Sequence, residues 1–314
     1  MKKIDVGISS CLLGQEVRYN GGHKLSRYCV NHLSKVFEFH PYCPEVAIGL
    51  GTPRETIRLV GEVDNPRVVG SKTEALDVTE PLREYGEKIA AQSDTLSGYI
   101  LMKSSPSCGL YSATVYKNNQ PLPGKHAGMF VRALAEKLPL LPMEEEGRLN
   151  DPRLRENFIA RVFAYHDWKC SVGKAPSPQK LVNFHSRYKY LVMAHSQAGY
   201  KRLGQLVAKA GVGDIKTHAD TYITILMSTL KKLASRKGHT NAMYHLLGYL
   251  KEGVPGNARQ ELAKHIEDYR EDIVCLSVPM ALLSHYLKLY GSDYIKQQAY
   301  LEPYAHDLGL RNAI

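Results

Sequence analysis

The sequence predicts an α/β domain with a doubly wound, mainly parallel sheet, followed by an all-α helical bundle. In the first half of the 314 residues, strand-like and helix-like stretches alternate, a pattern typical of parallel sheets. In the second half, apolar residues recur at three- and four-residue spacing, which indicates helices. We expect domains at residues 1–165 and 180–314, joined by a linker at residues 166–179 that is rich in Ser and Pro.

The first half contains short strand-like runs that end close to turn residues. The predicted strands, in chain order, are residues 3–9, 37–42, 57–60, 67–70 and 98–103. Predicted helices lie between or after them, at residues 23–36, 79–92, 126–138 and 152–169. Asp151 is the expected cap of the last helix, and Pro152 is its first residue.

The second half is predicted to form about six helices. They cover residues 181–196, 200–210, 214–236, 238–253, 257–272 and 279–290. Each stretch carries an apolar face at helical spacing, so the expected architecture is a bundle.

Composition favours a soluble globular protein. The chain is 44% hydrophobic and 23% charged, and no run of about 18 apolar residues predicts a membrane span. The first residues do not resemble a signal peptide, so we expect a cytoplasmic protein. In that compartment the six cysteines are expected to be thiols or metal ligands.

Positive charge is concentrated in the second half. Residues 1–170 hold 22 Lys and Arg against 20 Asp and Glu, whereas residues 171–250 alone hold 12 against 2. A basic half joined to a neutral half predicts a catalytic part and a part that binds a polyanion. The alternative is a cationic surface that only keeps the bundle in solution.

Three cysteines share one local pattern. Cys11, Cys43 and Cys108 each follow a strand-like run and are flanked by Ser, Pro or Gly. Because the carboxyl ends of parallel strands meet at one edge of a sheet, we expect these three loops to converge. Three thiolates form an incomplete tetrahedral set, which suits zinc with an open position or an iron–sulfur cluster with one free iron.

The other three cysteines lack this pattern. Cys29 falls on a predicted helix, Cys275 lies in an apolar run, and Cys170 lies within the predicted linker. We interpret them as buried structural thiols.

The sequence around the first three cysteines resembles a known family. The motifs "SSCLLG", "CPE" followed by "GLGTPRE", and "SPSCG" are similar to those of TudS-like thiouracil desulfidases, over roughly residues 1–165. The second half is similar to the helical domain found fused to them, through "FHSRYKYLVMAHSQAGYKRLG" and "QQAYLEPYAHDLGLRN". The arrangement resembles RudS-type desulfidases, which act on 4-thiouridine in tRNA.

The resemblance implies a 4Fe–4S cluster on Cys11, Cys43 and Cys108. It also places a catalytic carboxylate at Glu45 and a catalytic hydroxyl at Ser105. The implied reaction replaces C=S by C=O without net oxidation, so no nicotinamide or flavin is expected. Relatives often carry a basic residue where this chain has Ser104, which leaves the approach of the substrate to that loop open.

Several cations are candidate RNA contacts. Arg187 and Lys189 lie among aromatic residues, and Lys201 and Arg202 follow Tyr200, a mixture suited to phosphates and stacked bases. Arg54, in a glycine-rich turn, is interpreted either as a contact to a phosphate or base or as a structural arginine. The predicted partner is tRNA that contains 4-thiouridine.

Two other functions stay open at this point. One is desulfuration of free thiouracil or a thio-nucleotide, with the helical domain mediating self-association. The other is an RNA-binding iron–sulfur sensor that catalyses no reaction. Thiolation of tRNA, the reverse chemistry, is disfavoured because no phosphate-binding loop for ATP is found.

Overall fold

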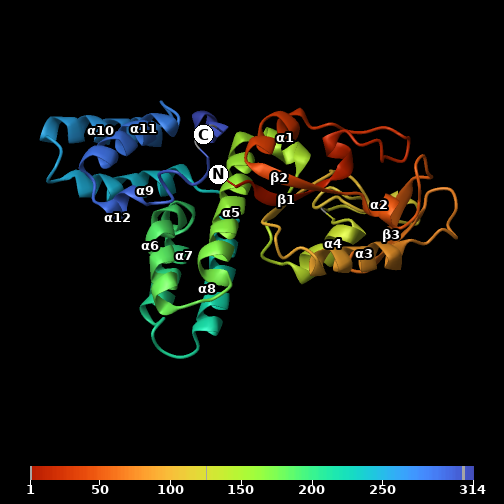
Figure 1. Cartoon of the computed structure of the whole chain (residues 1–314). Coiled ribbons are helices and arrows are strands. Elements are labelled where there is room, and N and C mark those ends of the chain that lie inside the picture. The colour runs from red at the N-terminus through yellow and green to blue at the C-terminus, as the bar shows by residue number, and fades with distance from the viewer. Residues whose placement is uncertain (1, 125, 306–307) are drawn as a thin grey trace. The chain divides into compact units, whose positions relative to one another are not determined.

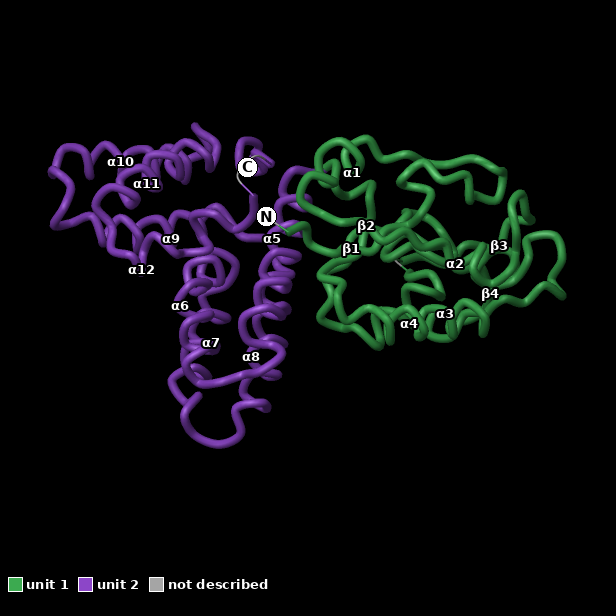
Figure 2. Tube along the Cα trace, in the orientation of Figure 1, with its two compact units in different colours: residues 1–150 green, residues 151–314 purple. Residues whose placement is uncertain are grey.

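The computed structural model describes residues 2–124, 126–305 and 308–314 (Figure 1). The chain forms two compact units, residues 1–150 and 151–314 (Figure 2). The sequence-based boundary at residue 165 placed most of the helix at 152–168 in the first unit. In the structure this helix contacts α8 (Ile215–Leu230) and belongs to the second unit.

A four-stranded parallel sheet forms the centre of the first unit. Its strands are β1 (Ile4–Ser9), β2 (Phe37–Tyr42), β5 (Gly98–Leu101) and β8 (Met143–Glu145), in the order β2-β1-β5-β8. Each neighbouring pair is parallel, which confirms the predicted parallel sheet. The predicted strand at 98–103 ends at Leu101, and the chain then turns into a loop.

A second, smaller sheet was not predicted as a separate element. It consists of β3 (Ile57–Gly61), β4 (Pro66–Gly70), β6 (Val115–Lys117) and β7 (Gln120–Pro121), in the order β4-β3-β6-β7. The β3–β4 pair is antiparallel, because a connection of only four residues reverses the chain. The alternation of strand-like and helix-like stretches predicts parallel strands, so it does not predict this antiparallel pair.

Two helices pack together in the first unit. They are α3 (Thr79–Ala91) and α4 (Met129–Lys137), and both lie below the strands in Figure 1. Gly86 of α3 allows close approach, since a Cβ there would lie 2.7 Å from the carbonyl oxygen of Phe130. The Phe130 ring in turn contacts Tyr99 of β5, with 6.1 Å between ring centroids. This contact packs α4 against one side of the parallel sheet.

The predicted helix at 23–36 is much shorter in the structure. It is reduced to α1 (Arg27–Asn31) and a 3₁₀ turn at Leu33–Lys35. The residues before α1 are bound to the loop that follows β1: Lys24 N–H donates to the carbonyl of Cys11 at 2.9 Å, and Ser26 N–H to that of Leu12 at 2.8 Å. These bonds hold residues 24–26 outside the helix.

The second unit is helical. Its helices are α5 (Pro152–Trp168), α6 (Pro178–His195), α7 (Gln197–Ala208), α8, α9 (Arg236–Leu247), α10 (Gly256–Arg270), α11 (Ser277–Tyr290) and α12 (Asp293–Lys296). The six predicted helices correspond to α6 through α11. As predicted, Asp151 caps α5, accepting from the N–H groups of Arg153 at 2.8 Å and Leu154 at 3.0 Å.

The predicted linker at 166–179 is largely helical. A π-helical turn at Lys169–Gly173 continues α5, and α6 begins at Pro178. Val172 within this turn is fully buried and anchors it to the second unit. Cys170 in the same turn is exposed, so the prediction of a buried thiol at this position is wrong. Among the described residues, no helix combines the length and apolarity that crossing a membrane requires.

Candidate active site

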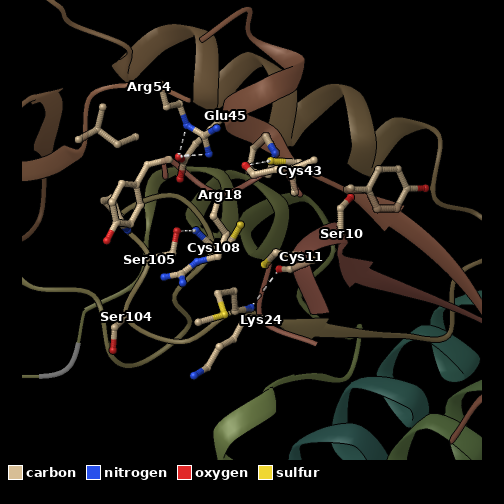
Figure 3. Close-up of a pocket in the computed structure, with 18 of the residues that line it drawn as sticks. Ser10, Cys11, Arg18, Lys24, Cys43, Glu45, Arg54, Ser104, Ser105 and Cys108 are labelled. Carbon is tan, nitrogen blue, oxygen red and sulfur yellow. Dashed lines mark hydrogen bonds and ion pairs between the residues drawn. The ribbon is translucent and has the colours of Figure 1, made fainter. Parts of the chain in front are cut away.

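One cavity of the first unit lies at the carboxyl ends of the parallel strands. Its volume is about 430 Å³. It is lined from the loops that follow β1, β2 and β5 (Figure 3). These are the three neighbouring strands whose loops were expected to converge. The end of β5 is tied to that of β1, since the Met102 N–H donates to Ser9 Oγ at 3.0 Å.

Cys11, Cys43 and Cys108 all line this cavity (Figure 3). Cys11 lies in a 3₁₀ turn directly after β1, Cys43 immediately precedes the short helix α2 (Pro44–Ala47), and Cys108 lies in the loop after β5. None of the three forms a disulfide. The structure therefore brings together the three cysteines that share the sequence pattern.

The environment of these thiols favours their protonated form in the absence of metal. Burial, followed by the nearby Cys43, raises the pKa of Cys11 to about 11. Burial also raises the pKa of Cys43, and burial followed by the Glu45 charge raises the pKa of Cys108 well above its ordinary value. A metal bound here would have to displace these protons, which is usual for cysteine ligands.

Glu45 is held from both sides. The Arg54 guanidinium donates to Oε2 of Glu45 through Nε at 2.8 Å and Nη2 at 2.6 Å. The Ser107 hydroxyl donates to Oε1 at 2.9 Å. The carboxylate lies two residues after Cys43, at the start of α2, and lines the same cavity. Both oxygens are thus fixed before any ligand binds.

Ser105 has a hydroxyl oriented by the backbone. Its Oγ accepts from the N–H groups of Ser107 at 3.2 Å and Cys108 at 3.0 Å. Because the oxygen accepts twice from the backbone, its own proton remains available for donation to a group in the cavity. Ser105 lines that cavity.

A buried carboxylate that sequence reasoning missed anchors the Cys108 loop. Glu145, at the end of β8, is only 4% exposed. Its Oε1 accepts from three consecutive backbone N–H groups, those of Leu110, Tyr111 and Ser112, at 2.8 to 3.1 Å. It also accepts from the Ser112 hydroxyl at 2.6 Å. The fourth strand of the sheet therefore also supports the site.

Arg54 has little capacity left for a substrate. Its side chain is 5% exposed, and besides its two bonds to Glu45 it donates through Nη1 to the Gly51 carbonyl at 2.8 Å. This geometry favours the interpretation of Arg54 as a structural arginine that positions Glu45, over contact with a phosphate.

Three cations that the sequence reasoning did not select also line the cavity: Arg18, Lys24 and Lys103. They lie near the cysteine motifs in the sequence, but an isolated Lys or Arg beside a motif is too common to be a signal. Whether such a cation has a functional role depends on the carboxylates that it contacts, and only the structure shows these contacts.

The other predicted RNA contacts lie in the second unit. Arg187 forms an ion pair with Asp167, and the Lys189 ammonium lies over the rings of Tyr190 and Tyr294 at 4.8 and 4.9 Å. Lys201 and Arg202 are exposed in the first half of α7. Within the described residues, neither forms an ion pair with a carboxylate.

Comparison with known proteins gives matches over both halves. The model of the 2-thiouracil desulfurase family matches residues 6–146, and that of DUF1722, a family of unknown function, matches residues 189–305. The Bacillus subtilis protein YbbK is 34% identical over 154 residues, which cover 46% of this chain and 97% of YbbK. YbgA of Escherichia coli is 29% identical over 166 residues, which cover 52% of this chain and 98% of YbgA.

One solved structure is also similar. The [4Fe-4S]-dependent thiouracil desulfidase TudS is 30% identical, with a TM-score of 0.37. The match covers 48% of this chain and 95% of TudS.

Proposed function

Because this chain belongs, through residues 6–146, to the 2-thiouracil desulfurase family, we propose that it removes sulfur from 4-thiouridine in tRNA and leaves uridine. The observation that carries the proposal is the convergence of Cys11, Cys43, Cys108, Glu45 and Ser105 on one cavity. The basic helical unit holds the RNA, and the first unit performs the chemistry.

The cysteine set fits a cluster better than a single ion. Within the described residues, no three His, Cys, Asp or Glu side chains gather closely enough to hold one metal ion. In a 4Fe–4S cluster each cysteine binds a different iron, so the thiolates need not share one centre. Among the described residues that line the cavity, only these three are cysteines, which leaves one iron free of protein thiolate.

We therefore assign the three cysteines to a 4Fe–4S cluster, the cofactor on which TudS depends. When bound, this cluster supplies a thiophilic Lewis acid for the sulfur of the thiocarbonyl group. The loops after β1, β2 and β5 each provide one ligand.

The net reaction is a hydrolysis. A bond forms between water oxygen and C4 of the pyrimidine, the C–S bond breaks, and sulfur leaves as hydrosulfide. No electrons are gained or lost, so neither nicotinamide nor flavin is required. The residues of the site must supply a proton acceptor for the water and a donor for developing negative charge.

Glu45 is the proton acceptor in this proposal. Its two oxygens are fixed by Arg54 and Ser107, so the carboxylate faces the cavity with little freedom to rotate. It takes a proton from the attacking water and returns it to the leaving group or the ring nitrogen. Ser105, whose oxygen is held by two backbone N–H groups, donates its proton to the negative charge that develops on the substrate.

The second unit supplies the contacts with RNA. Lys201 and Arg202 are exposed, and the charge of 12 basic against 2 acidic residues in 171–250 suits a polyphosphate. Lys189 lies beside the exposed ring of Tyr294, a combination suited to a phosphate next to a stacked base. Arg187 is the weaker candidate, since its charge is already paired with Asp167.

Free thiouracil is a second candidate substrate. The matching family is named for 2-thiouracil and TudS for thiouracil, and neither name includes RNA. The helical unit would then serve another purpose, such as self-association.

Salt dependence separates the two substrates. The reconstituted enzyme is assayed anaerobically with tRNA containing 4-thiouridine and with free 4-thiouracil, at increasing salt. We expect turnover of tRNA with a KM that rises steeply with salt, because each phosphate contact releases counterions. Turnover of free thiouracil without turnover of tRNA would show that the substrate is a small molecule. No turnover of either, with RNA binding retained, would favour a sensor.

A further inference from the structure

One cavity of the second unit is lined by polar side chains and a tyrosine. Its volume is about 440 Å³, and it lies between α6 and the segment formed by α12 and the residues that follow it. The described residues that line it are Asn183, Ser186, Arg187, Tyr294, Gln297 and Gln298. Three of these six carry a side-chain amide, which is an unusual concentration for one cavity.

The two walls of this cavity are fixed to each other. The Ala299 N–H donates to the Arg187 carbonyl at 2.9 Å, which ties the residues after α12 to α6. The Arg187 guanidinium is held by Asp167 of α5 in an ion pair. The Gln298 amide donates through Nε2 to the Tyr294 carbonyl at 3.0 Å. Tertiary contacts therefore shape the cavity before any ligand binds.

Two amide groups of the cavity wall have hydrogen-bonding capacity to spare. Gln298 is only 2% exposed, yet its Oε1 has no hydrogen-bond partner in the part of the chain that the structure describes. Asn183 accepts from Gln179 through Oδ1 at 2.7 Å, and within the described residues its Nδ2 donates to none. A buried acceptor without a partner costs free energy, which a bound donor would recover. The wall thus lacks a donor for Gln298 and an acceptor for Asn183.

Tyr294 adds an aromatic surface beside a positive charge. Its side chain is 38% exposed and lines the same cavity. The Lys189 ammonium lies 4.9 Å from the centroid of this ring. An exposed ring next to a cation suits a base that stacks on the ring while its phosphate pairs with the charge.

We propose that this cavity binds an unpaired adenine of the RNA. The adenine ring stacks on Tyr294, its N6 amino group donates to Gln298 Oε1, and its N7 accepts from Asn183 Nδ2. These are the two edge atoms through which Asn and Gln amides recognise adenine. The inference rests on the RNA-binding part of the proposed function and adds a second point of recognition, at a base other than the one that carries sulfur.

A base fits this cavity better than a phosphate or a protein segment does. Phosphate is bound mainly by charge, and Arg187, the one cation among the described residues of the lining, is already paired with Asp167. A docked protein helix would need apolar side chains, and the described lining contains no aliphatic residue. The competing explanation is a cavity that holds only water, in which case changes to its wall leave the affinity for RNA unchanged.

The test measures binding to single-stranded RNA and needs no turnover. Fluorescence anisotropy with the reconstituted full chain gives the Kd for labelled hexaadenylate, for labelled hexauridylate and for a blunt-ended RNA duplex. We expect hexaadenylate to bind at least about fivefold more tightly than hexauridylate. Tyr294→Ala removes the stacking ring, so the Kd for hexaadenylate should rise by about tenfold. The slope of log Kd against log salt and the Kd for the duplex should not change, because no charge is lost.

A second variant and two matched controls complete the test. Ser186→Leu fills the cavity and keeps Tyr294, so it should also weaken binding of hexaadenylate, with circular dichroism checking that the variant is folded. The controls are Tyr290→Ala on α11 and Ser228→Leu on α8, both exposed and outside the cavity lining. Both should keep the Kd values of the original chain.

The outcomes for this site and for the proposed function are distinguishable. Equal Kd values of the original chain for the two oligonucleotides, or a preference for hexaadenylate that survives both cavity substitutions, would overturn the inference even if tRNA is desulfurated normally. A chain that desulfurates no tRNA but shows a preference for hexaadenylate that depends on Tyr294 would contradict the proposed function and support the site.

Discussion

Arg54 and Glu45 form the most constrained ion pair in the catalytic cavity. Two guanidinium nitrogens of Arg54 donate to a single oxygen of Glu45, at 2.8 and 2.6 Å, and the two side chains are only 5% and 15% exposed. The Ser107 hydroxyl holds the other oxygen. If Glu45 is the catalytic carboxylate, as proposed, a group fixed in this way does not have to reorganise when the substrate arrives.

Replacing Arg54 tests whether it positions Glu45 or contacts RNA. Arg54→Lys keeps the charge but loses the paired contact with the carboxylate. We expect kcat for tRNA to fall by about tenfold or more, with the Kd for tRNA unchanged within twofold. Arg67→Lys, at an exposed ion pair with Asp77, serves as the control and should change neither. A large rise in the Kd for tRNA with a normal kcat would indicate that Arg54 contacts the RNA.

Replacing Glu45 tests its role as proton acceptor. Glu45→Gln retains the shape and one hydrogen-bond acceptor for Arg54 or Ser107, but it cannot take a proton. The expected loss of kcat is about 10² to 10⁴, with the iron content of the reconstituted protein unchanged. Single-turnover desulfuration under anaerobic conditions provides the measurement. Activity within a few-fold of the original chain would show that another group activates the water.

Ser105 and its neighbour Ser104 form a matched pair for substitution. Ser105→Ala removes both the proposed donor and the acceptor of two backbone N–H groups, so we expect kcat to fall by about 10² and stability to fall by about 1 to 2 kcal/mol. Ser104→Gly suits the positive φ of 57° at that residue and should leave kcat nearly unchanged. Thermal unfolding and kcat are measured for both. Equal losses of kcat in the two variants would contradict a specific role for Ser105.

Substitution of the exposed cations of α7 tests the proposed RNA-binding role of the second unit. Lys201→Gln/Arg202→Gln removes two charges, so the slope of log Kd against log salt for tRNA should decrease by about 1.4 to 1.8. Lys264→Gln, on α10, is the control and should leave the slope unchanged. Fluorescence anisotropy of labelled tRNA at several salt concentrations gives the slopes. Equal slopes for the double variant and the original chain would show that these two residues do not contact tRNA phosphates.

The buried side chain of His185 is expected to make the folded protein less stable in mild acid. Burial, helped by the charge of Lys189, lowers the pKa of His185 from 6.5 to about 4, and its Nδ1 lies 3.1 Å from the Tyr222 hydroxyl. The folded state therefore favours neutral histidine, whereas the unfolded chain binds a proton below its own pKa of about 6.5. The contribution of His185 to the free energy of unfolding is therefore fully present above pH 6.5. It falls by about 3 kcal/mol as the pH falls toward 4.

Urea unfolding at pH 7 and pH 4.5 measures this effect. His185→Gln keeps a polar partner for Tyr222 and does not titrate, so it should lose less stability between the two pH values than the original chain. The same loss in both proteins would assign the acid sensitivity to other groups.

Much of the catalytic site could be predicted from the sequence. Cys11, Cys43 and Cys108 each end a strand-like run, and parallel strands bring such ends together by geometry alone. The structure places all three on one cavity, together with Glu45 and Ser105, the two residues identified by family resemblance. Their catalytic and ligand roles stay predictions until the variants above are measured.

The remaining features depend on contacts between distant parts of the chain. Glu145 supports the Cys108 loop from 33 to 35 residues away, and no local pattern distinguishes it from the neighbouring Glu144 and Glu146. Arg54 changes from a candidate phosphate contact to a partner of Glu45 once its bonds are seen. The helical continuation of α5 is likewise set by packing of Val172, which overrides the local signal of a linker.

The most direct test follows the modified nucleoside itself. The protein is reconstituted anaerobically with iron and sulfide and incubated with bulk tRNA, and 4-thiouridine, uridine and released sulfide are then quantified after digestion. The proposed function predicts loss of 4-thiouridine with matching gains of uridine and sulfide, abolished by Cys108→Ala and reduced at least a hundredfold by Glu45→Gln. Unchanged 4-thiouridine with a fully loaded cluster and bound tRNA would contradict it.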